Sequence, residues 1–323
     1  MRLSRRQAAA GLFALGGAAA PLSHAFAQAL PNAPGPEEAP TELGTGRDGF
    51  EHMLAPVTVN GQGPFQFLID TGANTSCIAR DLAQRLALKA TEPARVHTVV
   101  GVRERPGVMI EKLQVGDRSR RSVRAASLPL EAGLDGVLGV DWLIGQRLEL
   151  GFKAKSLNIT RSKADVSREG VAVVPARRSQ GQLTIVDADL NGRRISAMID
   201  SGSQMTICNT ALRTLVSDFN RRGRRDDAYS RVNLETVLGE SFSGELIYLP
   251  FLRLGGLQMG NVPAVWADMH VFELWGLKET PALVLGMDLL TQFDTVALDF
   301  GRSQVRFDLS EGQLNPASAP KPA

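Results

Sequence analysis

The stretch "FLIDTGANTSCI" occupies residues 67–78, and a second stretch of similar design, "AMIDSGSQMTIC", occupies residues 197–208. In both, an apolar run ends in an acid, a hydroxyl residue and a glycine. These two triplets are Asp70-Thr71-Gly72 and Asp200-Ser201-Gly202. A repeat of this length within one chain indicates that a structural unit is duplicated, and this duplication decides the fold.

The sequence around the triplets is repeated as well. Before each triplet, two stretches of alternating apolar residues flank an Asn-Gly pair, which is typical of a β-hairpin with a tight turn. After each triplet, an amphipathic pattern predicts a short helix, over residues 79–86 in the first copy and 210–216 in the second. Farther along, "DGVLGVDWL" at residues 135–143 corresponds to "ALVLGMDLL" at residues 282–290.

This order of elements predicts an all-β protein made of two β-barrel lobes, related by a pseudo-twofold axis and carrying only short helices. We assign the N-terminal lobe to residues 48–165 and the C-terminal lobe to residues 166–310. Residues 30–47 are rich in Pro, Gly and Glu and are predicted to be a linker, and residues 311–323 are predicted to be a disordered tail.

The N-terminus has the pattern of an export signal. Residues 1–29 contain basic residues, a short apolar run and then small residues in Ala-x-Ala spacing. The apolar run over residues 8–20 is shorter than the roughly 20 residues that a membrane-spanning helix needs. We therefore expect export to the periplasm or the medium, by a twin-arginine-like or a Sec route, and no stable membrane span.

Composition and charge exclude several classes of function. Hydrophobic residues make up 43% and charged residues 22%, as in soluble globular domains. Loss of the signal removes three arginines and no acid, which changes the net charge from +2 to −1 and argues against a nucleic-acid partner. The histidines show no metal-ligand spacing, so we expect neither a metal nor another cofactor; they are His24, His52, His97 and His270.

The two cysteines follow the triplets at unequal distances. Cys77 lies seven residues after Asp70, and Cys208 lies eight residues after Asp200. Because side chains alternate between the faces of a strand, these offsets place the thiols on opposite faces of equivalent strands. Two buried free thiols are therefore favoured over a disulfide, which stays the alternative.

Two carboxylic acids brought together by a pseudo-twofold axis can act as a coupled acid and base. At about 3 Å apart they cannot both be ionised, so they share one proton. One then acts as a general base toward a bridging water while the other donates its proton to a carbonyl under attack. If Asp70 and Asp200 meet in this way, hydroxyls from Thr71 and Ser201 can bind the opposite loop.

The segments "LIDTGA" and "MIDSGS", each followed by "VLG" at residues 137–139 and 284–286, resemble the retropepsin-like and pepsin-like aspartic proteases. The resemblance covers about residues 50–309. It implies that Asp70 and Asp200 are catalytic and that the substrate is a polypeptide. It also implies that both loops are supported by their own residues, namely Thr71, Gly72, Ala73, Ser201, Gly202 and Ser203.

Because one chain carries both triplets, we expect a monomer with an intramolecular pseudo-dimer, and pairing of two chains is the alternative. Val140 and Met287 replace the arginine that retroviral enzymes carry behind the site, and the first candidate flap has no tyrosine. A catalytically silent peptide-binding or regulatory module therefore stays the alternative function. The candidate flaps are residues 99–107 and 237–244, chosen for glycines that flank polar residues.

Two further expectations concern acids near the site. Asp141 and Asp288 each stand at the start of a predicted short helix and are interpreted as N-caps. Ser203 can donate a hydrogen bond to Asp200, whereas Ala73 has no hydroxyl to offer Asp70. This difference predicts that Asp200 carries the charge and Asp70 the proton, with an activity optimum at mildly acidic to neutral pH.

Overall fold

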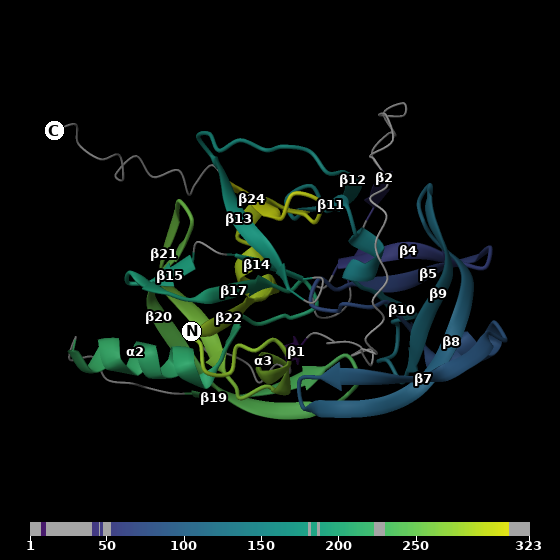
Figure 1. Cartoon of the computed structure of the whole chain (residues 1–323), viewed down its shortest axis with the longest axis horizontal. Helices are drawn as coiled ribbons and strands as arrows, with labels where there is room; N and C mark the ends of the chain where they lie inside the picture. Colours follow the sequence, from purple (N-terminus) through teal and green to yellow (C-terminus); the bar gives the residue numbers. More distant parts are fainter. Residues whose placement is uncertain are drawn as a thin grey trace, which may run out of the picture.

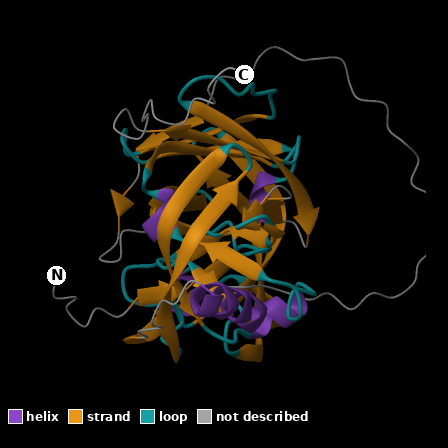
Figure 2. Cartoon of the chain, turned by 90° about the vertical axis from the view of Figure 1, so that its left-hand side faces the viewer, coloured by secondary structure: helices purple, strands orange, loops and turns teal. Residues whose placement is uncertain are grey.

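The computed structural model describes residues 8–10, 41–44, 46–47, 53–179, 182–185, 188–222 and 230–309. Strands form most of this part of the chain, and the helices are short and peripheral (Figure 2). The helical elements are α1 (Arg80–Arg85), the 3₁₀ turn η1 (Val140–Leu143), α2 (Thr210–Arg222), α3 (His270–Leu274) and α4 (Met287–Leu290).

An 8-stranded sheet forms the N-terminal lobe, in the order β3-β4-β5-β10-β6-β9-β8-β7. An additional pairing of β4 with β8 curls this sheet toward a barrel. Its strands are β3 (Gly46–Arg47), β4 (Met53–Val59), β5 (Gln62–Ile69), β6 (Cys77–Ala79), β7 (Lys89–Thr98), β8 (Gly101–Val115), β9 (Arg118–Leu128) and β10 (Gly136–Leu138).

A 16-stranded sheet contains the C-terminal lobe and also the last strands of the N-terminal half. Those last strands are β11 (Gln146–Gly151) and β12 (Ser156–Arg161). The C-terminal strands are β13 (Val171–Ser179), β14 (Gln182–Ile185), β15 (Ala188–Leu190), β16 (Arg193–Arg194), β17 (Ser196–Ile199), β18 (Ile207–Cys208), β19 (Ser230–Thr236), β20 (Ser241–Leu254), β21 (Leu257–Trp266), β22 (Ala282–Leu285), β23 (Phe293–Asp299) and β24 (Gln304–Leu309).

Each lobe holds its triplet strand in the same pattern. In the N-terminal lobe β5 pairs in parallel with β10, which pairs antiparallel with β6. The C-terminal lobe repeats this with β17, β22 and β18. The predicted duplication is therefore confirmed, and so is the all-β fold of two barrel-like lobes.

One set of strands joins the halves. β11 pairs with β12 on one side and with β23 of the opposite half on the other, and β13 pairs with β24. Figure 1 shows these strands in the upper middle of the view, between the N-terminal lobe in blue and the C-terminal lobe in green and yellow. A shared sheet fixes how the lobes face each other, because its ladder hydrogen bonds set the register.

The core has a separate layer on each face of the triplet strands. Phe67 and Ile69 of β5 point into the main apolar cluster, while Leu68 between them points into a smaller cluster. In β17, Ile199 belongs to the main cluster and Met198 to a third one. This alternation is the period of two that a strand buried on both faces requires.

The tight turns and one helix follow the sequence closely. Asn60 and Asn191 have positive φ (50° and 53°), as the predicted hairpin turns need. Helix α1 lies within the range predicted for it. Helix α2 starts where expected but continues to Arg222 rather than ending at residue 216, because its sequence offers no Gly or Pro before that point.

Several predicted regions fall where the structure describes little. Of the signal segment it describes the backbone of β1 (Ala8–Ala10), which pairs in parallel with β19. Within the predicted linker it describes β2 (Thr41–Gly44), which pairs with β12, and β3. Residues 311–323 lie outside the described residues. No helix of the described residues is long and apolar enough to cross a membrane.

Candidate active site

The two triplets start at equivalent points of the two lobes. The Asp70 N–H donates to the Leu138 carbonyl of β10, and the Asp200 N–H donates to the Leu285 carbonyl of β22, both at 3.1 Å. Each aspartate therefore follows the last residue of a central strand, where the chain leaves the sheet. The strand and its parallel neighbour fix the position of each acid.

The hydroxyl residues of the triplets bind across the lobe boundary. The Thr71 hydroxyl donates to the Ile199 carbonyl (2.9 Å) and accepts from the Ser201 N–H (3.0 Å). The Ser201 hydroxyl donates to the Ile69 carbonyl (2.8 Å) and accepts from the Thr71 N–H (3.1 Å). These four buried bonds lock the two loops together, as the sequence suggested for these hydroxyls.

The glycines of the triplets let the two carboxyl groups approach the opposite backbone. A Cβ atom added to Gly202 would lie 2.4 Å from the carboxyl carbon of Asp70, and Gly72 stands in the same relation to Asp200. Only a residue without a side chain fits at either place. Asp70 and Asp200 are both buried, at 0% and 1% exposure. Because each carboxyl group lies against the glycine of the opposite triplet, the structure brings the two predicted acids together at the lobe boundary.

Backbone amides of its own loop hold each carboxylate. Asp70 Oδ1 accepts from the N–H groups of Gly72 (2.8 Å) and Ala73 (3.0 Å). Asp200 Oδ1 accepts from the Gly202 N–H (2.8 Å). The Ser203 hydroxyl does not contribute, because it donates to the Met205 carbonyl instead (2.8 Å).

The burial of the two acids affects the pKa of the pair. Burial, and then the negative charge of Asp70, raise the pKa of Asp200 well above its usual range. The two buried acids therefore oppose each other's ionisation, so that the pair retains a proton. The hydrogen bond from the Ser203 hydroxyl to Asp200, on which the predicted charge of Asp200 depended, is not formed; the assignment of the charge to one of the two acids stays a prediction.

A second pair of acids supports the loops from behind. Asp141 accepts from the Ser76 hydroxyl (2.8 Å), and Asp288 accepts from the Thr206 hydroxyl (2.7 Å) and N–H (2.9 Å). The helices η1 and α4 have Gly139 and Gly286 at the N-cap position, with no side-chain cap. The N-cap interpretation of the two acids was therefore wrong.

Ser76 and Thr206 are functional candidates that the sequence reasoning missed. Each lies six residues after its triplet aspartate, and that shared hydroxyl offset was the available signal. Each hydroxyl also accepts from the glycine N–H of the "VLG" segment, Gly139 at 3.1 Å and Gly286 at 3.2 Å. Burial raises the pKa of both partner acids, although the hydrogen bonds from these hydroxyls act in the opposite direction.

Two long hairpins correspond to the predicted flaps. One is β7–β8 with its tip at Val99 and Val100, and the other is β19–β20 with its tip at residues 237–240. Figure 1 shows both running along the same edge of the molecule. The predicted ranges, 99–107 and 237–244, contain the tips and only the first residues of the second strands, and they omit the first strands. Arg103 and Glu240 form an ion pair between the two hairpins (3.7 Å).

The cysteines are free and buried, which confirms the prediction of two thiols. Cys77 packs in the cluster around Leu68, and Cys208 in the main core, so they lie on opposite faces of equivalent strands. Burial raises the pKa of both thiols far above its usual range. No group of three or more His, Cys, Asp or Glu suited to a metal occurs among the described residues.

Comparison with known proteins agrees with this geometry. A family model described as aspartyl protease matches residues 55–142 and 186–289, which include both triplets and both segments behind them. Together the matched segments cover more than half of the 323 residues. No curated protein matches the sequence at a significant level.

Proposed function

The chain belongs to the aspartyl protease family, and from that membership we propose that it is an endopeptidase that hydrolyses peptide bonds with a water held between Asp70 and Asp200. The observation that carries the proposal is the placement of each carboxyl group against the glycine of the opposite triplet. Two acids held so close share a proton, which is the state that acid–base hydrolysis requires.

The proposed reaction uses one acid as base and the other as acid. The charged Asp70 removes a proton from the water, whose oxygen attacks the peptide carbonyl, while Asp200 gives its proton to the carbonyl oxygen. The tetrahedral intermediate then collapses: the C–N bond breaks, the nitrogen takes the proton held by Asp70, and Asp200 regains a proton from the intermediate's hydroxyl. The raised pKa of Asp200 supports this division of roles.

We further propose that the substrate is a polypeptide held beneath the two hairpins and that the chain works as a monomer. Support comes from the shared sheet, in which β11 pairs with β23 of the same chain, so that one chain supplies both triplets. Light scattering tests this part of the proposal. A molar mass near that of one chain is expected, and a mass near that of two chains would contradict it.

Export to the periplasm or the medium is proposed from the pattern of residues 1–29. Cell fractionation, with N-terminal sequencing of the protein recovered, tests it directly. A chain that begins near residue 28 in the periplasm or medium is expected. Recovery of the chain from the cytoplasm with Met1 or Arg2 still present would contradict the proposal.

The experiment that tests the proposed activity is digestion of a diverse peptide library across a range of pH, followed by identification of the cut sites. Wild-type protein is compared with Asp200→Asn and with wild type inhibited by pepstatin. Cleavage that both treatments abolish supports the proposal. If folded wild-type protein cuts nothing, the silent peptide-binding module becomes the better interpretation, and the same library then serves to detect binding.

A further inference from the structure

The tips of the two hairpins dock on opposite lobes through equivalent contacts. The His270 N–H donates to the Val99 carbonyl, and the Glu131 N–H donates to the Val237 carbonyl, both at 3.0 Å. Val99 and Val237 are buried, at 2% and 1% exposure. Val99 belongs to the apolar cluster of the C-terminal lobe that includes Met198, Val265 and Phe272, and Val237 to the N-terminal cluster that includes Leu68, Ala73 and Val137.

A histidine pair is present at the N-terminal tip. His97 on β7 and His270 at the start of α3 bring Nδ1 and Nε2 to 3.2 Å, with the rings stacked at a centroid distance of 5.4 Å. The two tips have similar sequences, "HTVVG" at residues 97–101 and "ETVLG" at residues 235–239. Glu235 therefore stands in the second tip where His97 stands in the first, and Glu131 makes the backbone bond that His270 makes.

The geometry of the pair limits how many protons it can hold. One ring nitrogen must donate and the other must accept, so a single added proton leaves the hydrogen bond in place and makes it charge-assisted. A second proton turns both nitrogens into donors and places two positive rings in contact. Contact between the rings is therefore lost only when both histidines are protonated.

The surroundings make the second protonation harder while the tip is docked. Burial, then His270 and Arg95, lower the pKa of His97 from its ordinary value of 6.5. Charged groups lie on each element around the pair: Arg95 on β7 itself, Arg103 and Glu104 on the paired strand β8, and Asp268, Glu273 and Lys278 on and beside α3. Lys278 and Glu273 form an ion pair with each other (3.7 Å), so the charges of these two side chains largely cancel near the histidines.

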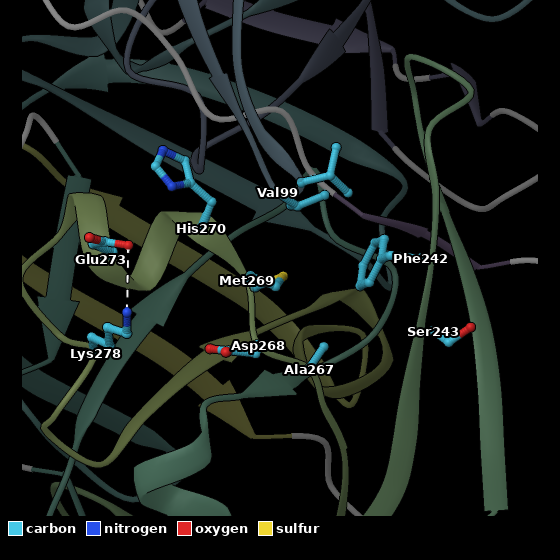
Figure 3. Close-up of a pocket in the computed structure, with 10 residues that line it drawn as sticks. Val99, Phe242, Ser243, Ala267, Asp268, Met269, His270, Glu273 and Lys278 are labelled. Carbon is cyan, nitrogen blue, oxygen red and sulfur yellow. Dashed lines mark ion pairs between the residues drawn. The ribbon is translucent and has the colours of Figure 1, made fainter.

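Solvent has a route to the pair. A cavity of about 410 Å³ borders the docked tip and is lined by Val99, Val100, Phe242 and His270, among others. Figure 3 shows His270 on its helix beside Val99 of the opposite lobe, with the ion pair of Glu273 and Lys278 on the helix side of the same cavity. Protons can therefore reach His270 from this cavity without any opening of the protein.

We propose that His97 and His270 form a pH-dependent latch that keeps the N-terminal hairpin docked on the C-terminal lobe and releases it when both rings are protonated. The sign follows from the lowered pKa of His97. Docking favours the neutral ring, so the latch is intact above pH 6.5 and weakens as the pH falls below that value. The hairpin of Val237 has no histidine at the corresponding positions and does not share this response.

The latch has a consequence for catalysis that rests on the proposed function. The proposed function places the substrate beneath the two hairpins, so its entry requires the Val99 tip to leave its apolar cluster, and the open fraction of the protein then scales the apparent affinity. Release of the latch therefore lowers KM as the pH falls, whereas kcat depends on the dyad and is expected to be the same with and without the latch at any one pH. In that role the two histidines are positioning residues, since neither lies at the dyad.

Hydrogen–deuterium exchange of the whole protein tests the latch without any substrate. The amides of residues 98–101 and of His270 are compared at about pH 7.5 and about pH 5, after correction for the intrinsic pH-dependence of exchange. We expect exchange at the lower pH to be faster by about tenfold. This value follows if docking lowers the affinity of the histidine pair for its second proton by about a factor of ten, because undocking then becomes about ten times more favourable at low pH. Residues 236–240 of the second tip are the internal control and are expected to show no such change.

The matched variants are His97→Gln and His270→Gln, singly and combined, because glutamine retains hydrogen bonding but cannot become charged. In each variant the additional exchange at low pH is expected to disappear. Equal exchange ratios in wild type and variants, or an equal response of both tips, would overturn the proposal. If a variant does not fold, the two imidazoles of the wild-type protein are titrated by NMR instead. Their chemical shifts must show a protonation step below the ordinary pKa of histidine, at the same pH at which exchange at the first tip becomes faster.

Activity then separates the two proposals. If the protein cleaves peptides, the decrease in KM at low pH must be present in wild type and absent in the glutamine variants, while kcat at each pH stays unchanged. If exchange shows the latch but no peptide is cleaved, the latch is retained and the proposed function fails. If cleavage is found without the exchange response, the latch fails and the proposed function is retained.

Discussion

Gly72 lies so close to the carboxyl group of Asp200 that a Cβ atom on the glycine would be 2.5 Å from the carboxyl carbon. Carbon atoms that are not bonded pack at about 3.5–4.0 Å. Gly202 repeats this contact with Asp70 from the other lobe. The absence of two side chains is therefore what allows the two acids to meet, and it makes the glycines as necessary to the site as the acids.

Gly72→Ala is expected to force the loops apart, with a loss of about 1–3 kcal/mol of unfolding free energy, typical of overpacking, and loss of peptide cleavage. Thermal unfolding and peptide hydrolysis measure the two effects. Gly256→Ala is the matched control, since a Cβ there meets nothing within 4 Å. If Gly72→Ala unfolds and cleaves like the Gly256 variant, the two loops are not in close contact.

Thr71→Ala removes a hydroxyl that makes two buried bonds across the lobe boundary. We expect a loss of about 1–3 kcal/mol, because the partners at Ile199 and Ser201 lose a hydrogen bond in a buried place. Thr71→Ser retains the hydroxyl and, by analogy with Ser201, should be close to wild type. A double-mutant cycle with Ser201→Ala should show strong coupling, whereas additive losses would mean that the two hydroxyls act independently.

Asp200→Asn should stabilise the protein at neutral and higher pH. The pKa of Asp200 is raised in the folded state above its ordinary value of 3.8, so its contribution to stability is complete below pH 3.8 and is lost as the pH rises through the raised pKa. Each tenfold difference in proton affinity between the folded and unfolded states corresponds to about 1.4 kcal/mol. Asparagine cannot ionise and avoids this loss.

Thermal unfolding across pH checks this prediction. The difference in Tm between Asp200→Asn and wild type should increase from acid toward neutral pH. Asp117→Asn, which changes an exposed carboxyl group on the turn between β8 and β9, is the control. A difference in Tm that stays constant with pH would show that Asp200 is not held in its protonated form.

Ser76→Ala should weaken the loop behind Asp70. The substitution deprives the buried Asp141 of a hydroxyl donor and the Gly139 N–H of its acceptor, with an expected cost of about 1–3 kcal/mol. Ser76→Thr is the matched variant, because Thr206 makes the same bonds in the other lobe. Urea unfolding should rank threonine near wild type and alanine well below it; equal values for the two variants would rule out the support role.

The sequence could predict the features that local rules govern. Asn60-Gly61 specifies its turn because both residues adopt positive φ, and the strand ending at Asp70 is recognisable by its period of two. Asp70 and Asp200 could be placed together because the repeat implies a pseudo-twofold axis. The same symmetry identified the hydroxyl and glycine partners in each triplet.

The features missed depend on where side chains point or on contacts between distant residues. The Ser203 hydroxyl had two acceptors within its reach, and only the folded loop decides that it bonds Met205. Asp141 and Asp288 sit in first turns where an N-cap is the usual interpretation, yet their donors come from another loop. His97 and His270 are separated by 173 positions, so no spacing rule could bring them together.

Whether the two acids act as one unit is decided by the rate of peptide hydrolysis by Asp70→Asn, Asp200→Asn and the double variant, each confirmed to be folded. Residues that act as one unit give losses that are far from additive. We predict that each single variant loses as much activity as the double variant. Substantial cleavage by either single variant, or losses that multiply in the double variant, would show that the two acids do not form one catalytic dyad.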